Sequence, residues 1–178
     1  MALSFGERII GAAMLNPAVY EEVEADESAM GQAAAFVALA AVAGAIGAYR
    51  AGVGGMIAAV VSAFISWALW AALTYVVGTK LFGGTATWGE LLRTLGFAQA
   101  PGILSILGII PILGGIVRFV VWIWVLVAGV IAIRQALDFD TGKAILTAVI
   151  SMVVVMVVSM AIGLFTAGLA VMGGALGH

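Results

Sequence analysis

Five long apolar segments, separated by short polar or glycine-rich breaks, constrain the fold of this chain more than any other feature. They cover residues 32–49, 56–77, 88–110, 117–137 and 144–172. A helix needs about 20 predominantly apolar residues to cross the hydrocarbon core of a bilayer. The composition agrees, because 65% of the 178 residues are hydrophobic and 9% are charged, whereas a soluble domain carries about 25% charged residues. We expect an all-α integral membrane protein with a five-helix transmembrane bundle over residues 32–178.

Residues 1–31 form an acidic head before the first apolar segment, with six acidic residues against one arginine. Ser4 and Glu7 have the spacing of a capping box, which predicts the start of a first short helix. Asn16 ends that helix and precedes Pro17, which suits the first position of a second one. We expect two short interfacial or cytoplasmic helices outside the hydrocarbon. Their negative charge argues against nucleic acid or anionic lipid as a partner of the head.

The composition excludes several kinds of catalytic and metal site within one chain. There is no cysteine, and the one histidine is the last residue, His178. Thiolate metal sites, histidine clusters and Ser/His/Asp triads therefore cannot form within the chain. Met152, Met156 and Met160 recur at helical spacing, a pattern that could ligate Cu(I) but that ordinary packing explains better. We predict a protein that is not an enzyme, with no cofactor, no metal ligand and no identifiable small-molecule substrate.

Charged side chains near the membrane are the candidate partner contacts. A basic partner would dock on the acids of the head, unless these only form a solvated helix face. Glu90 and Arg93, three residues apart, favour a helix-surface ion pair, with a partner contact as the sharper alternative. The complete candidate set is Glu21, Glu22, Glu24, Asp26, Glu27, Glu90 and Arg93.

Prolines mark the expected breaks in the helices. Pro17 begins a head helix and Pro111 forms a turn, while Pro101 lies inside the third apolar segment. Pro101 lacks a backbone donor and would clash with the carbonyl of Phe97, so it predicts a kink. The side chains expected to satisfy the released carbonyl are Thr94, Gln99 and Ser105. Small residues at four-residue spacing, among them Ala40, Gly44 and Ala48, favour close helix packing.

The distribution of Lys and Arg predicts the orientation of the five spans. The head, the second loop and the fourth loop share one side and carry five of the seven cations. Because cytoplasmic loops are enriched in Lys and Arg, we expect a cytoplasmic N-terminus and an extracytoplasmic C-terminus.

Three segments resemble the Yip domain family, a group of polytopic proteins whose eukaryotic members bind Rab-type GTPases and act in vesicle traffic. They are LNPAVYEE at residues 15–22, WGELLRTLGFAQAP at residues 88–101, and the turn at residues 111–115 before an aromatic fourth span. The resemblance implies five membrane helices with a cytoplasmic N-terminus. The short head is more similar to that of prokaryotic members, which implies a prokaryotic inner or plasma membrane.

The sequence favours a function in protein-protein contacts within the membrane. We expect a non-enzymatic scaffold or accessory subunit whose partners are the lipid bilayer and other membrane proteins or a second copy of the chain. The alternative is a small channel or permease formed by oligomerisation.

Overall fold

The computed structural model describes the backbone of residues 3–47 and 52–176 and, within these ranges, the side chains up to residue 158 and that of residue 160. Two short helices form the head. They are α1 (Phe5–Ala13) and α2 (Pro17–Ala25). The Ser4 side chain accepts from the Glu7 backbone, and the Glu7 side chain accepts from the Ser4 backbone, so the predicted capping box is present. Asn16 caps α2, and Pro17 is its first residue. The local signals for both helix starts are therefore confirmed.

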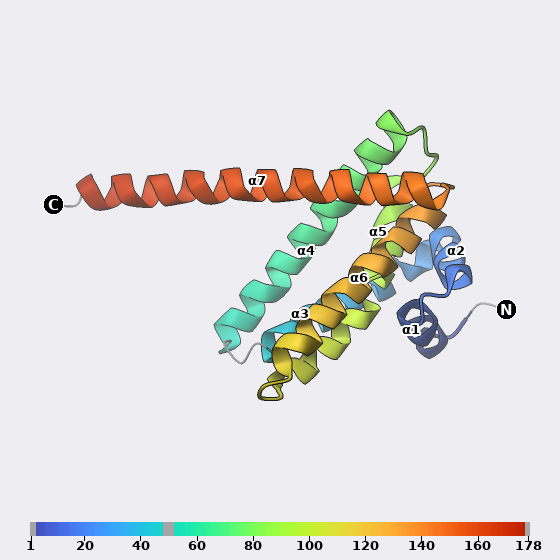
Figure 1. The fold of residues 1–178 in the computed structure, drawn as a ribbon, viewed down its shortest axis with the longest axis horizontal. Helices are drawn as coiled ribbons and strands as arrows, with labels where there is room; N and C mark the ends of the chain where they lie inside the picture. Colours follow the sequence, from blue (N-terminus) through green and yellow to red (C-terminus); the bar gives the residue numbers. More distant parts are fainter. Residues whose placement is uncertain (1–2, 48–51, 177–178) are drawn as a thin grey trace.

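Five helical segments are long and apolar enough to cross a bilayer, as the apolar stretches predicted. The first is α3 (Met30–Gly47) after a 3-10 turn, η1 (Glu27–Ala29), and the second is α4 (Val53–Val76), which continues as a π-helical turn, η2 (Val77–Leu81). The third combines α5 (Trp88–Phe97) with a 3-10 helix, η3 (Ala100–Ile109). The fourth and fifth are α6 (Gly114–Ala136) and α7 (Thr141–Leu176), whose N-terminal half lies across α4 and α6 (Figure 1).

The third segment changes helix type near Pro101. The α-helix ends at Phe97 and ten residues of 3-10 helix follow, a run much longer than the usual three or four residues. At the position where a kink was expected, the segment therefore changes from an α-helix to a 3-10 helix. Among the described residues, none of the three expected side chains donates to the Phe97 carbonyl. The Thr94 hydroxyl instead donates to the carbonyls of Glu90 and Leu91, 3.0 and 3.4 Å away. Thr94 lies one turn too early to reach Phe97.

A seam of small residues brings α3 against the third segment. The positions Ala33, Ala40 and Gly47 recur every seven residues along α3 and lie on one face. A Cβ atom on Gly96 would lie 2.6 Å from the Cβ of Ala33, and one on Gly102 would lie 2.9 Å from the Cβ of Ala40. Both are closer than real Cβ contacts, so glycine is required for this approach.

Gly47 makes the closest approach of the seam and shows where the predicted spacing differs. A Cβ on Gly47 would lie 2.0 Å from the Ser105 carbonyl oxygen. Of the predicted small residues, Ala40 lies in the seam, whereas Gly44 faces open space and Ala48 lies outside the described residues. The contact face of α3 thus repeats every seven residues, which is about two turns of an α-helix, and the four-residue spacing misses it.

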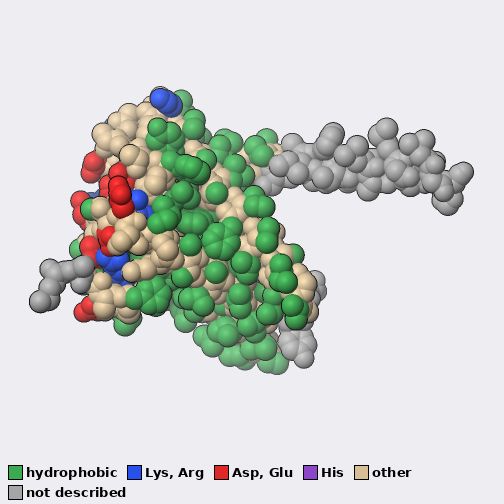
Figure 2. All heavy atoms as spheres, turned by 180° about the vertical axis from the view of Figure 1, so that it is seen from behind, with side chains coloured by type: hydrophobic (Ala, Val, Ile, Leu, Met, Phe, Trp, Pro, Cys, Tyr) green, Lys and Arg blue, Asp and Glu red, His purple; other side chains and the backbone are tan. Residues whose placement is uncertain are grey.

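Acidic side chains gather along one side of the molecule, while hydrophobic side chains cover most of the rest of the face in Figure 2. The acidic side contains the head. Many large apolar side chains elsewhere are exposed, including Ile65, Phe119 and Met156. A surface of this kind is unstable in water and suits the hydrocarbon of a bilayer.

Candidate functional site

A buried arginine joins the two head helices to the first membrane helix. Arg8 Nη2 lies 3.1 Å from Glu22 Oε1 and 2.6 Å from Asp26 Oδ2, and its Nη1 donates to Gln32 Oε1 at 3.1 Å. A hydrogen bond from the Ser28 side chain, followed by one from Arg8, holds the pKa of Asp26 below its ordinary value. These two contacts are the ion pairs within 4 Å among the residues the structure describes. Two of the candidate contact acids, Glu22 and Asp26, therefore already have a cationic partner inside the protein.

Arg93 holds the end of α2 against α5. Its Nε donates to the Val23 carbonyl at 3.0 Å, 70 residues away in sequence, and its Nη2 donates to the Glu24 carbonyl. The Arg93 side chain is buried. Since the last carbonyls of a helix have no intrahelical partner, a cation at this point both caps the helix and complements its dipole.

Glu90 has a separate role at the start of α5. Its carboxylate accepts from the Thr87 backbone at 2.8 Å, and the Thr87 hydroxyl accepts from the Glu90 backbone at 3.3 Å. The two residues therefore form a capping box. No Glu90–Arg93 ion pair is found in the described part of the chain. The expected helix-surface pair is wrong, because Glu90 bonds to Thr87 at the start of its own helix whereas Arg93 bonds to the end of α2.

Glu24 lies near three other carboxylates at the head side of the molecule, and we call the four residues the acidic cluster (Glu21, Glu24, Glu90 and Asp138). Glu24 is half-buried, and burial raises its pKa to about 7, with further repulsion from the other three carboxylates and an opposing effect of Arg93. Glu21 is exposed and accepts a hydrogen bond of 2.7 Å from Gln135. The residues of the cluster come from α2, α5 and the turn after α6, which are far apart in sequence.

The head is fixed to the membrane helices at several further points. The Trp124 indole of α6 donates to the Ala13 carbonyl at 2.8 Å, which holds the end of α1. The Phe5 and Phe36 rings stack with their centroids 5.3 Å apart. Together with Arg8 and Arg93, these contacts hold the head in a fixed position on the bundle. Glu27, the remaining candidate acid, is exposed in the turn before α3.

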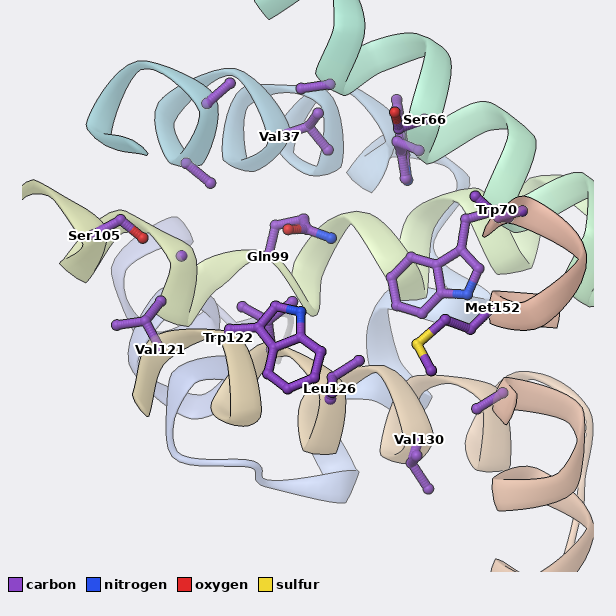
Figure 3. A pocket seen from close by; sticks show the side chains of 18 of the residues that line it. Val37, Ser66, Trp70, Gln99, Ser105, Val121, Trp122, Leu126, Val130 and Met152 are labelled. Carbon is purple, nitrogen blue, oxygen red and sulfur yellow. The ribbon is translucent and has the colours of Figure 1, made fainter. Parts of the chain in front are cut away.

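A pocket of about 670 Å³ lies among α3, α4, η3, α6 and α7 (Figure 3). Apolar side chains make up most of its wall, with the Trp70 and Trp122 rings prominent in it. Its polar side chains come from three segments and are Ser66 of α4, Gln99 and Ser105 at the start of and within η3, and Arg118 of α6. This volume is in the ordinary range for sites that bind small molecules, about 300–1,000 Å³.

Two close contacts shape the pocket wall. A Cβ on Gly129 would lie 2.6 Å from the Trp70 ring, so glycine allows this ring to pack against α6. Arg118 Nη1 donates to the Gly47 carbonyl at 3.2 Å and so caps the end of α3. The pocket was not predicted from the sequence, because its wall combines residues from five helical segments. Gln99 and Ser105, two polar side chains in the third apolar segment, were signals available in the sequence.

The methionine face divides between two environments. All three side chains are exposed, and of the three only Met152 also lines the pocket. The thioethers therefore do not all face one enclosed site. Among the described residues there is also no group of three or more His, Asp or Glu side chains that could hold a metal ion.

The helices and the apolar surface define an integral, multi-pass α-helical membrane protein. The sequence model of the Yip1 domain family matches residues 11–163, and the chain belongs to that family. The matched region starts in α1 and runs into α7. The resemblance found in residues 15–22 and 88–101 is therefore confirmed. The family is generally non-catalytic. No curated protein and no solved structure matches the chain.

Proposed function

We propose that the protein is a non-enzymatic scaffold or accessory subunit that binds other membrane proteins through its cytoplasmic head. Membership of a family of membrane proteins supports this proposal, as does the fixed position of the head on the bundle. A surface that is already ordered loses less conformational entropy when a partner binds. The head is therefore better suited to docking than a flexible tail of the same charge.

The acidic cluster is the observation that carries the proposal. Glu24 of α2 lies near Glu21, Glu90 and Asp138, and repulsion from these three carboxylates adds to the effect of burial in raising the pKa of Glu24. A basic surface on a partner would relieve this repulsion. Glu27, which is exposed and close in sequence to Glu24, would be a further contact for it. Arg93 is buried beneath this acidic surface and acts as a positioning residue, because its side chain holds the end of α2 in place.

Recovery of partners from native membranes tests the docking surface. The combined variant Glu21→Gln, Glu24→Gln and Glu27→Gln should recover less partner at low salt. Wild-type recovery should fall as salt rises, because screening shortens the reach of exposed charges. Glu7→Gln is the control, since it removes an acid outside the cluster while Gln can still serve in the capping box. Equal recovery by the combined variant and the control would contradict docking on these acids.

A small oligomeric channel or permease is the other function to test. The pocket within one chain is mainly apolar, and Arg118 is the one charged side chain among its lining residues. A pathway for ions would need more polar groups along its length. Solute flux into liposomes that contain only this protein would favour the channel, whereas partner recovery without flux favours the scaffold.

A further inference from the structure

We propose that the pocket binds one anionic phospholipid, with the phosphate at Arg118 and one acyl chain lying along α6. The pocket is among membrane-spanning helices, and several of its lining side chains are exposed on the outer surface, including Trp122, Ile145 and Val149. The material around that surface in a bilayer is lipid. A lipid chain is thus the occupant that can reach the pocket directly.

The polar groups of the pocket follow the order of groups in a phospholipid. Ser105 lies at the end near Val121, with Gln99 and Trp122 further in, while Met152 lies at the opposite end (Figure 3). Arg118 lies one helical turn before Val121 on α6. A cation, a hydroxyl and an amide therefore precede an apolar region. This order matches a phosphate, a glycerol ester and a hydrocarbon chain, and Ser66 on α4 is the one polar side chain outside it.

The length of the pocket matches one leaflet. The α6 residues that line it run from Arg118 to Val130. Twelve helical steps cover about 18 Å at about 1.5 Å per residue. One leaflet contributes about half of the 30 Å hydrocarbon core. A chain anchored at Arg118 would therefore extend across one leaflet without leaving the pocket.

Arg118 is placed to recognise negative charge. The aliphatic part of its side chain packs against Gly108, where an added Cβ would lie 3.3 Å from Arg118 Cγ. Its Nη1 donates to the Gly47 carbonyl at the end of α3. Within residues 3–47 and 52–158, no other side chain or backbone group bonds to its remaining donors. The residues that line the pocket include no carboxylate. A guanidinium at the edge of an apolar pocket, with donors that no described residue accepts from, favours an anionic headgroup, and phosphate suits its geometry.

Gln99 gives an independent reason to expect a polar group within the pocket. Its carboxamide has no hydrogen-bond partner in the described part of the chain, although it lies among apolar side chains. An unpaired amide in an apolar environment is costly. The carbonyl oxygen of a lipid ester would accept from its NH₂ group.

Native mass spectrometry in detergent with equal amounts of phosphatidylglycerol and phosphatidylcholine tests this site. We expect wild-type protein to retain one phosphatidylglycerol. Arg118→Gln should reduce the preference for phosphatidylglycerol about fivefold, as expected for one basic contact at a membrane surface. Arg118→Lys should keep most of it. Arg134→Gln is the matched control, because it removes an exposed arginine at the other end of the same helix.

A pocket-filling variant tests the chain site separately from the headgroup. Ala148 is half-buried in the pocket wall, so Ala148→Phe should expel the retained lipid while Arg118 stays in place. In vesicles containing phosphatidylglycerol with brominated chains, the same variant should lose the part of the tryptophan quenching that comes from Trp70, which is half-buried and lines the pocket. Quenching of the exposed Trp122 by surrounding lipid should remain. Equal retention of both lipids, equal effects of Arg118→Gln and Arg134→Gln, or retention by Ala148→Phe would overturn the proposal. A lipid-free dimer would also overturn it.

Discussion

Two arginines in this protein cap the C-terminal ends of helices that are distant from them in sequence. Arg93 donates to the carbonyls of Val23 and Glu24 at the end of α2, and Arg118 donates to the Gly47 carbonyl at the end of α3. In each case a cation meets the negative end of a helix dipole. Arg93 is buried, so its hydrogen bonds form where water competes little.

Arg93→Gln should destabilise the protein by about 2 kcal/mol, because hydrogen bonds from a charged donor contribute about 1.5–3 kcal/mol. The free energy of unfolding in mixed detergent measures this change. Arg134→Gln makes the same substitution at an exposed residue of α6 and should change stability by less than about 0.5 kcal/mol. Equal effects of the two substitutions would show that Arg93 does not hold α2.

Glu24 should make stability depend on pH. Its folded-state pKa is about 7, above the ordinary value of 4.5, because of burial first and then neighbouring carboxylates. A raised pKa means that the folded state binds the proton more tightly, so the contribution of Glu24 to stability is greatest below about pH 4.5 and is lost as the pH rises to about 7. Glu24→Gln cannot ionise, so its Tm relative to wild type should increase across this range and then level off. Glu27→Gln is the charge-matched control, and an equal trend there would contradict this origin.

At the scale of elements, close packing depends on where glycine stands on each helix. Gly47→Ala should destabilise strongly, by more than about 2 kcal/mol, because its Cβ would overlap the Ser105 carbonyl oxygen of η3. Gly44→Ala lies on the same helix with nothing within 4 Å of the added atom. It should be neutral or stabilising by up to about 1 kcal/mol through helix propensity. Thermal unfolding in detergent compares the two variants, and similar Tm values would contradict the seam.

The change from α5 to η3 follows from proline and from the small-residue seam together. Pro101 removes one donor and disfavours a continuous α-helix, and Gly96 and Gly102 on either side of it let α3 approach closely. The longer rise of a 3-10 helix then lets a short run of residues extend through the bundle. The resulting segment supplies Gln99 and Ser105 to the pocket.

At the scale of the whole molecule, charge is divided between two ends. The acidic cluster and the Arg8 contacts lie with the head, and Arg118 lies at the N-terminal end of α6, away from Arg134 and the turn that follows. With five spans, the head and the end of α7 lie on opposite sides of the membrane. We propose that the head is cytoplasmic, because its side carries more Lys and Arg in the loops.

A reporter fused after His178 tests this orientation, and it should be extracytoplasmic. A reporter fused before Met1 should be cytoplasmic and serves as the paired control. The physical reason is the excess of Lys and Arg on the head side, which resists translocation. A cytoplasmic reporter after His178 in an intact chain would contradict either the number of spans or their orientation.

Local signals in the sequence determined the helices of this protein. Runs of about 20 apolar residues identified the five spans, and side chains three residues apart identified the helix start at Ser4. The break at Pro101 was also predictable, because it depends on one residue and its own backbone. These features depend on neighbours within one or two turns, so a sequence pattern contains them.

The tertiary structure alone decided which side chains meet. Arg93 finds its acceptors about 70 residues away on α2, while the neighbouring Glu90 turns to its own helix start. Burial against the rest of the fold is the main cause of the raised pKa of Glu24, with smaller effects of Glu90 and Asp138, which are far away in sequence. The pocket takes its wall from five helical segments. Such contacts depend on how helices cross and on the rotation of each about its axis. In a bilayer almost every face of these helices is apolar, so hydrophobic periodicity does not reveal that rotation.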